Sequence, residues 1–246
     1  MRFPMIALGL LLAGNVLAAT PEETVRQAMA NITPQLKVDA AQESQVPGFY
    51  EAIVGGEFVY VSKDGRYVMV GSAFDAVNKL DLTQTARAKV RKTALAKVGP
   101  EKRITFLPKA PIATKHTVTV FTDVDCPFCR RFHEQVALYN AKGIAVDYLF
   151  YPLSIHPGAD KKAEAVWCSK DRANAFTAAM SGQDPGKATC PNPVPELTQL
   201  AQSLGIGGTP TMLADDGSQI ASQIAMSPDQ LAAELDRLAA ASAAKN

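Results

Sequence analysis

The sequence lacks an excess of charge of either sign. Its 246 residues include 25 Lys and Arg against 24 Asp and Glu, so the formal net charge is +1 at pH 7. Domains that bind nucleic acid electrostatically are usually strongly basic, and this balance therefore argues against nucleic acid as a partner. Hydrophobic residues make up 47% of the chain and charged residues 20%, which is ordinary globular composition and excludes a disordered chain.

Cysteine and long apolar runs are also scarce. Four cysteines are too few to staple a chain of this length into a small disulfide scaffold, but they suffice for one redox pair and one structural bridge. Beyond the N-terminus, no segment approaches the roughly 20 apolar residues that a membrane-spanning helix needs. The length corresponds to one or two domains.

Residues 1–19 have the pattern of a secretory signal peptide. Arg2 supplies a positive start, Ile6 to Leu12 form a short apolar run, and the segment before Ala19 suits cleavage at Ala18 or Ala19. An N-terminal anchor is the alternative, although the apolar run is too short to span a bilayer. Export predicts an oxidising compartment, in which disulfides form and persist.

Residues 20–82 predict a small, mostly antiparallel unit. A helix is expected from Thr20, a capping residue followed by Pro and two Glu, until Pro34. Three strand-like runs follow, at 46–53, 58–61 and 67–70, and an Asp-Gly pair predicts a hairpin between the last two. A unit of about sixty residues buries little surface alone, so it is expected to lean on the rest of the chain or on a second copy.

Residues 83–100 predict a linker helix. The segment 83–98 is rich in Ala, Lys and Arg and contains no Gly or Pro, and Gly99-Pro100 then ends the helix. A mostly polar helix between two units suits a solvent-exposed spacer, and a plain surface helix is the alternative.

Strands and helices alternate from residue 101 to the end, which predicts a second domain over 101–246. Strands at 117–122 and 144–151 flank a helix at 127–140, and this βαβ unit implies parallel pairing. The later elements are expected to be a helical stretch over 159–204, a hairpin over 211–221 and a closing amphipathic helix over 228–240.

The segment Cys126-Pro127-Phe128-Cys129 carries the chemistry. It directly follows a predicted strand and starts a predicted helix, where free N–H groups and the helix dipole favour a thiolate. Pro127 fits the first turn because that position needs no N–H donor. The pattern predicts Cys126 as the attacking thiol and Cys129 as the resolving thiol. Phe128 is expected either to touch a client or to pack on its own domain.

The charged neighbours of this pair do not settle its reactivity. Asp125 opposes a thiolate next to it, and Arg130 and Arg131 offset Asp125 to an extent that the sequence does not determine. Asp123 and His133 are expected to be solvated groups at a helix cap and on a helix face, and tuning of the thiols is the alternative for each. The remaining histidines at 116 and 156 have no evident partner.

A C-x-x-C segment also occurs in metal sites, haem attachment sites and structural disulfides. A zinc site needs four ligands, usually from two such pairs. His133 lies four residues after Cys129, but the sequence has no second C-x-x-C pair, which argues against zinc. Haem attachment is excluded because Arg130, not His, follows the second cysteine. A purely structural disulfide stays open, although a tight bridge at a helix start is an unusual structural choice. Neither a metal nor a cofactor is expected.

Two further signals lie downstream. Cys168 and Cys190 favour a structural disulfide in an exported protein, with a second redox couple or free thiols as alternatives. Thr209 and Pro210 directly precede a strand, where proline cannot donate to a sheet. A cis Thr209-Pro210 bond would account for this position, and an ordinary trans turn is the alternative.

Together these segments resemble the thioredoxin fold, and more closely the bacterial periplasmic DsbC/DsbG disulfide isomerase family. The similarity is carried by five segments: Phe121 to Cys129, Ala165 to Asp171 with Cys190, Gly208-Thr209-Pro210, Tyr60 to Arg66, and Gly71. They span nearly all of the chain after residue 19. Two departures stand out: Pro127-Phe128 replaces the Gly-Tyr pair best known in DsbC, and Val120 stands where thioredoxin has a buried Asp.

The resemblance implies an α+β protein of two domains. A small antiparallel, cystatin-like N-terminal domain dimerises, a linker helix follows, and a thioredoxin fold with a helical insertion at about 157–204 carries the cysteines. It also implies a V-shaped periplasmic homodimer whose apolar cleft holds misfolded exported proteins, and whose active cysteines the membrane reductase DsbD keeps reduced. In this family the segment at Thr209 and Pro210 is a cis-proline loop beside the redox pair, and Cys168 pairs with Cys190.

The function expected from the sequence is rearrangement of non-native disulfides through Cys126 and Cys129. A DsbG-like protein or a monomeric oxidase is the alternative within the same chemistry, but an oxidase has no use for the N-terminal unit. A non-enzymatic periplasmic chaperone is the alternative from another class.

Overall fold

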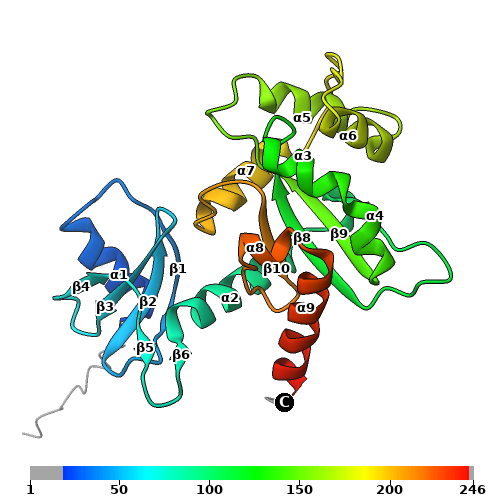
Figure 1. Cartoon of the computed structure of the whole chain (residues 1–246). Helices are drawn as coiled ribbons and strands as arrows, with labels where there is room; N and C mark the ends of the chain where they lie inside the picture. The colour runs from blue at the N-terminus through cyan, green and yellow to red at the C-terminus, as the bar shows by residue number, and fades with distance from the viewer. Residues whose placement is uncertain (1–18, 244–246) are drawn as a thin grey trace, which may run out of the picture.

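The structure is a computed structural model that describes residues 19–243. Two lobes, each with a four-stranded sheet, are joined through helix α2 (Leu82–Leu95), as Figure 1 shows. Residues 1–18 of the predicted signal peptide lie outside the described residues. Among the helices of the described part, none is both long and apolar enough to cross a membrane.

The N-terminal lobe packs one helix on an antiparallel sheet. Its elements are α1 (Pro21–Ala30), β1 (Val38–Glu43), β2 (Phe49–Val54), β3 (Glu57–Ser62) and β4 (Val68–Val70), with the strands in the order β1-β2-β3-β4. Helix α1 starts where the sequence predicts, because the Thr20 hydroxyl accepts a hydrogen bond from the Glu23 N–H at 3.2 Å. The predicted hairpin between β3 and β4 is confirmed. Two short strands, β5 (Phe74–Asp75) and β6 (Leu80–Asp81), pair separately.

The structure corrects one predicted strand of this lobe and adds a strand that was not predicted. The strand expected from residue 46 begins at Phe49, since Pro47 and Gly48 form a turn in which Gly48 has φ +83°. Strand β1 was not predicted, because its sequence Val-Asp-Ala-Ala-Gln-Glu has no alternation of apolar and polar side chains. It is a strand because it pairs with β2.

The sheet buries both of its faces. Side chains that alternate along β2 and β3 pack on α1 from one side, among them Val54 and Val61 against Val25. The other face, with Ile53, Phe58 and Tyr60, packs on Ala86 of α2. Strand β4 lies at the edge, and its Val70 side chain is exposed.

Helix α2 is not the solvent-exposed spacer that its composition predicts. Its first half covers the N-terminal sheet, and Leu95 near its end joins the core of the C-terminal lobe together with Phe121 and Leu149. Even Arg91 is only 3% exposed, and burial lowers its pKa to about 10. A helix with a polar sequence thus has one part of its surface buried against two lobes, which composition alone cannot reveal.

The C-terminal sheet has the order β10-β8-β9-β7. Its strands are β7 (Ile104–Phe106), β8 (His116–Thr122), β9 (Ile144–Phe150) and β10 (Thr211–Ala214). β8 and β9 are parallel, which confirms the predicted βαβ unit, and the two outer strands are antiparallel to them. The second arm of the predicted hairpin after β10 is reduced to one bridge, between Leu213 and Gln219.

Helices cover both faces of this sheet. They are α3 (Pro127–Glu134), α4 (Val136–Ala141), α5 (Ala159–Trp167), α6 (Arg172–Met180), α7 (Val194–Ser203), α8 (Ser222–Ala225) and α9 (Pro228–Ala243). One core contains Phe132, Tyr139, Phe176 and Leu231 from α3, α4, α6 and α9, and the opposite core contains Leu197 of α7. The helix expected over 127–140 is two helices, broken at Gln135, where φ is −97° and ψ is 4°. Of the helical stretch expected as an insertion, α5 contacts both α6 and α7, and α7 also contacts β9.

Candidate active site

Both cysteines of the C-x-x-C segment lie where β8 passes into α3. Cys126 is the N-cap residue of α3, with extended backbone angles of φ −75° and ψ 120°, and Pro127 takes the first helical position. The Cys126 carbonyl accepts the first helical hydrogen bond from the Arg130 N–H at 3.1 Å. Both thiols are free and nearly enclosed, at 4% exposure for Cys126 and 1% for Cys129.

The environment of Cys126 favours its thiolate. A hydrogen bond from the Cys129 thiol is the largest cause that lowers the pKa of Cys126 to about 5, and burial opposes it. The backbone N–H groups of Cys129 and Phe128 contribute in the same direction, as free donors at a helix start do. A thiol with this pKa is ionised at neutral pH and is therefore a competent nucleophile.

Cys129 has the opposite character. Burial is the largest cause that raises its pKa far above the ordinary value, and the hydrogen bond to Cys126 adds to the rise. The Thr122 hydroxyl and the Asp123 N–H lower it only in part. Two thiols one helical turn apart are thus held in different states, one anionic and one protonated.

The loop before β10 lies against Cys126. The Thr209–Pro210 peptide bond is cis, and the Cys126 sulfur lies 3.2 Å from the Thr209 carbonyl oxygen, to which it donates a hydrogen bond only in its protonated form. The Thr209 hydroxyl, buried and without another hydrogen-bond partner among the described residues, also lowers the pKa of Cys126. β10 pairs with β8, and this pairing brings together residues 83 positions apart.

An apolar cavity of about 280 Å³ opens beside this loop. Phe128 lines it and is 60% exposed, so this side chain does not simply pack into its own domain. The other walls come from the loop, β10 and α8: Phe132, Thr209, Pro210, Met212, Ile220, Ser222, Ala225 and Met226.

Asp123 is not the solvated cap group that the sequence predicts. Its side chain is fully buried and accepts hydrogen bonds from the N–H groups of Asp125 at 2.9 Å and Leu153 at 2.8 Å. The Nδ1 atom of His156 lies 2.8 Å from the same carboxylate. Asp123 thereby ties the loop that carries Cys126 to the loop after β9, and the expectation that His156 lacks a partner was wrong.

The other histidines also have partners. His133 is buried, not solvated, with its ring nitrogens 3.0 Å from the hydroxyls of Tyr148 and Thr177. Burial lowers the pKa of His133 to about 4, so the ring is neutral at physiological pH. His116 pairs with Asp236 at 2.7 Å. Each partner lies on a different element, far away in the sequence.

Asp125 is the carboxylate next to the attacking sulfur. One of its oxygens is 3.0 Å from the Arg130 guanidinium, and both are within 2.9 Å of the Lys162 ammonium on α5. Arg131 is exposed and forms no ion pair within residues 19–243. The sequence indicated Arg130, but it held no signal for Lys162, which lies 37 positions away from Asp125.

Cys168 and Cys190 form a disulfide, with an S–S distance of 2.07 Å and a Cα–Cα distance of 5.7 Å. Cys168 directly follows α5, and the Asn192 side chain donates to Glu164 of α5 and to the Cys190 carbonyl. The bridge thus anchors the end of α5 to the segment before α7. It involves neither of the free thiols at the start of α3.

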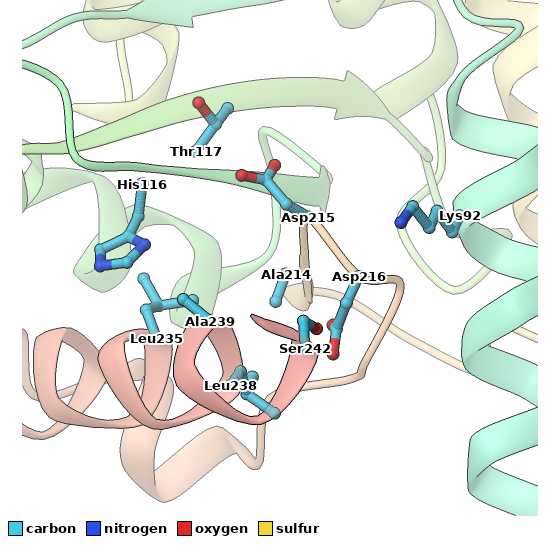
Figure 2. Close-up of a pocket in the computed structure, with 10 residues that line it drawn as sticks. All are labelled: Lys92, His116, Thr117, Ala214, Asp215, Asp216, Leu235, Leu238, Ala239 and Ser242. Carbon is cyan, nitrogen blue, oxygen red and sulfur yellow. The ribbon is translucent and has the colours of Figure 1, made fainter. Parts of the chain in front are cut away.

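A second pocket, of about 300 Å³, is drawn in Figure 2. It lies among α2, α9, the turn after β10 and the start of β8, where His116 and Thr117 are found. Cys126 follows the opposite end of β8, so this pocket contains none of the redox chemistry. Within the described residues, no group of three or more His, Cys, Asp and Glu is placed to hold a metal ion.

Comparisons with known proteins agree with this geometry. Residues 16–84 match the disulfide bond isomerase protein N-terminal domain, and residues 107–239, more than half of the chain, match the thioredoxin-like domain. The thiol:disulfide interchange proteins DsbC of Escherichia coli K12 and of Dickeya dadantii are 30% and 32% identical over 212 residues, 86% of each chain. A solved disulfide interchange protein from Neisseria gonorrhoeae is 36% identical over 47% of this chain and 81% of its own, with a TM-score of 0.42.

These matches confirm the expected fold class, an α+β protein of two domains with a thioredoxin-like C-terminal part. Each alignment covers 86% of this chain and 86% of the relative, so the similarity extends over both domains. The chain belongs to the DsbC family of thiol:disulfide interchange proteins.

Proposed function

We propose that the protein is a periplasmic disulfide isomerase that rearranges non-native disulfides through Cys126 and Cys129. The observation that carries this proposal is the split between the two thiols: the pKa of Cys126 is lowered to about 5, while that of Cys129 is raised. An exchange enzyme needs one sulfur that attacks and a second that is held back until it is required.

The reaction begins when the Cys126 thiolate attacks one sulfur of a client disulfide. A Cys126–client bond forms, the client S–S bond breaks, and the other client sulfur leaves as a thiolate. If that thiolate attacks a further client disulfide, a later client thiolate can attack the Cys126-bound sulfur. This attack releases Cys126 as a thiolate, and the client is isomerised without net oxidation.

Cys129 releases the client when the Cys126–client mixed disulfide is not resolved by a client thiolate. Loss of its proton lets its sulfur attack Cys126 and break the bond to the client, which leaves as a reduced thiolate. The enzyme is then oxidised, with a Cys126–Cys129 disulfide, and must be reduced before it can act again. The membrane reductase DsbD is the partner proposed for that step, because it has this role in the family that the sequence resembles.

Client binding is proposed to use backbone more than sequence. The loop with Thr209 and Pro210 is beside the attacking sulfur, where an extended client segment can pair with its backbone. The apolar cavity next to it suits the apolar side chains that unfolded proteins expose. This arrangement supports a chaperone-like hold on clients that differ in sequence.

Dimerisation is proposed to use the edge of the N-terminal sheet. Strand β4 lies at that edge, and three exposed apolar side chains gather there: Tyr67, Met69 and Val70. A bare apolar edge strand is a template for pairing with another chain, and a second copy would cover it. We propose residues 20–82 as the dimerisation domain, 83–100 as the linker, and 101–246 as the catalytic domain.

Periplasmic location is proposed from the secretory pattern of residues 1–19 and from the Cys168–Cys190 disulfide. Fractionation of cells that express the full chain tests it. The protein should be released with the periplasmic contents by osmotic shock, and retention in the membrane pellet would favour the N-terminal anchor.

The central test replaces Cys126 with Ser. Wild-type protein should reduce insulin and recover scrambled ribonuclease, and this variant should lose both activities. Activity that survives the substitution would exclude Cys126 as the nucleophile. A Cys126→Ala/Cys129→Ala double variant that keeps all activity in cells would instead favour a chaperone without redox function.

The oxidase alternative is separated by two measurements on wild-type protein. Light scattering after size exclusion gives the oligomeric state, and alkylation of cell extracts gives the state of the two thiols. A mostly reduced dimer supports the isomerase, and a mostly oxidised monomer supports an oxidase.

A further inference from the structure

The carboxylate of Asp125 disfavours the thiolate that the proposed exchange reaction requires at Cys126. Its carboxylate directly precedes Cys126 in the chain, and its side chain is only 16% exposed. A negative charge there repels the negative charge that the Cys126 thiolate carries. Because both groups are largely enclosed, solvent and salt screen this repulsion less than they would at the surface.

Two cations from different elements meet this carboxylate. Arg130, on α3 itself, approaches one oxygen at 3.0 Å and also donates from Nε to the Val124 carbonyl at 2.8 Å. Lys162, on α5, approaches both oxygens at 2.8 Å and 2.9 Å. The two-oxygen contact makes Lys162 the closer of the two partners.

The position of Lys162 depends on how α5 is anchored. Its N–H donates to the Gly158 carbonyl at 3.1 Å in the first turn of the helix, and the disulfide at Cys168 holds the other end. The neighbouring carboxylate of Asp123 accepts a hydrogen bond from the Asp125 N–H at 2.9 Å, and its other oxygen lies 2.8 Å from His156. No other cation within residues 19–243 forms an ion pair with Asp125.

We propose that Lys162 is a positioning residue that holds and neutralises Asp125, so that the carboxylate does not suppress the reactivity of Cys126. This inference rests on the proposed exchange reaction and adds a residue outside the C-x-x-C segment that tunes it. The insertion helix α5 thereby acts on the attacking sulfur through one carboxylate, without touching the client.

The test substitutes Lys162→Gln and compares it with Lys161→Gln. Lys161 is the neighbouring lysine on α5, 77% exposed and 3.4 Å from Glu164, and it makes no contact with Asp125. The pKa of the Cys126 thiol is measured from thiolate absorbance across pH in the full-length reduced proteins. Lys162→Gln should raise this pKa by about half a unit to one unit, and Lys161→Gln should leave it unchanged.

The redox equilibrium with glutathione is the second readout. A less stable thiolate favours the disulfide form, so Lys162→Gln should shift the equilibrium toward oxidised enzyme by roughly three- to tenfold. Lys162→Arg keeps the cation and should restore most of the wild-type value. If Lys162 had only a structural role, the Cys126 pKa and the glutathione equilibrium would not depend on whether residue 162 carries a positive charge, as in Lys162→Arg, or none, as in Lys162→Gln.

A double-mutant cycle identifies Asp125 as the mediator. Asp125→Asn alone should lower the Cys126 pKa or leave it unchanged, and adding Lys162→Gln in that background should have no further effect. An equal shift from Lys162→Gln with and without Asp125, or no shift in the wild-type background, would overturn the proposal. The thiol pKa does not depend on isomerase activity, so loss of ribonuclease recovery in the Cys126→Ser test addresses the proposed function separately.

Discussion

The folded state of the reduced protein should become more stable as the pH rises from 5 toward 9, because folding ionises Cys126. The hydrogen bond from Cys129 is the main cause that lowers the pKa of Cys126 from 9.0 to about 5. Between these two values the folded protein holds a thiolate while the unfolded chain holds a thiol. Stability from such a group is present above the higher value and is lost as the pH falls to the lower one.

The size of the effect follows from the shift. Each pKa unit corresponds to about 1.4 kcal/mol, so the two units between pH 5 and pH 7 contribute about 3 kcal/mol to the free energy of unfolding. Above pH 9 the raised pKa of Cys129 acts in the opposite direction, because the unfolded chain then ionises this thiol and the folded protein does not. Beyond that pH the contribution of Cys126 is constant, and the reduced protein should lose stability through Cys129.

The measurement is urea unfolding of reduced protein at pH 5, 6 and 7, with Cys126→Ser as the reference. Serine has nearly the same size and does not ionise, so subtraction of its free energy of unfolding removes the contribution of every other titrating group. The difference should grow in favour of wild-type protein by about 1.4 kcal/mol per pH unit. Cys129→Ser, which changes the donor to Cys126, should flatten this slope. Parallel curves for wild-type and Cys126→Ser protein would refute the assignment of a thiolate.

Three other predictions concern parts of the fold away from this sulfur. Burial lowers the pKa of His133 to about 4, so stability should fall from pH 6.5 to pH 4 through this group, and the difference from His133→Gln in urea unfolding should shrink over that range. Val70→Lys places a charge on the exposed edge strand and should convert dimer to monomer in light scattering, whereas a dimer that persists at low micromolar concentration would exclude this edge. Gly217→Ala should lower the melting temperature and cost about 1–3 kcal/mol, because Gly217 has φ +84° and its Cβ would overlap the Ala88 carbonyl of α2; an unchanged melting temperature would contradict the close approach of these two segments.

Features that depend on neighbours in the chain were predictable from the sequence. The start of α1 follows from a capping Thr before Pro, and the start of α3 follows from Pro127 after a β-rich run. The hairpin between β3 and β4 follows from Asp-Gly, and the parallel pair β8 and β9 follows from the βαβ order. The C-x-x-C segment could be placed at a helix start for the same reason, since caps, turns and the helix dipole act within a few residues.

Features that depend on contacts between distant segments were decided only by the tertiary structure. Strand β1 has no periodic pattern of apolar residues and exists because β2 pairs with it. Helix α2 has a polar composition but buries part of its surface against two lobes. Asp123 and His133 look like surface groups until loops and helices far away in the chain supply their partners. The same holds for Lys162, whose charge reaches Asp125 only because α5 folds back over the start of α3. Electrostatic interactions depend on distance in space, and a linear pattern carries no information on which distant side chains will share a buried site.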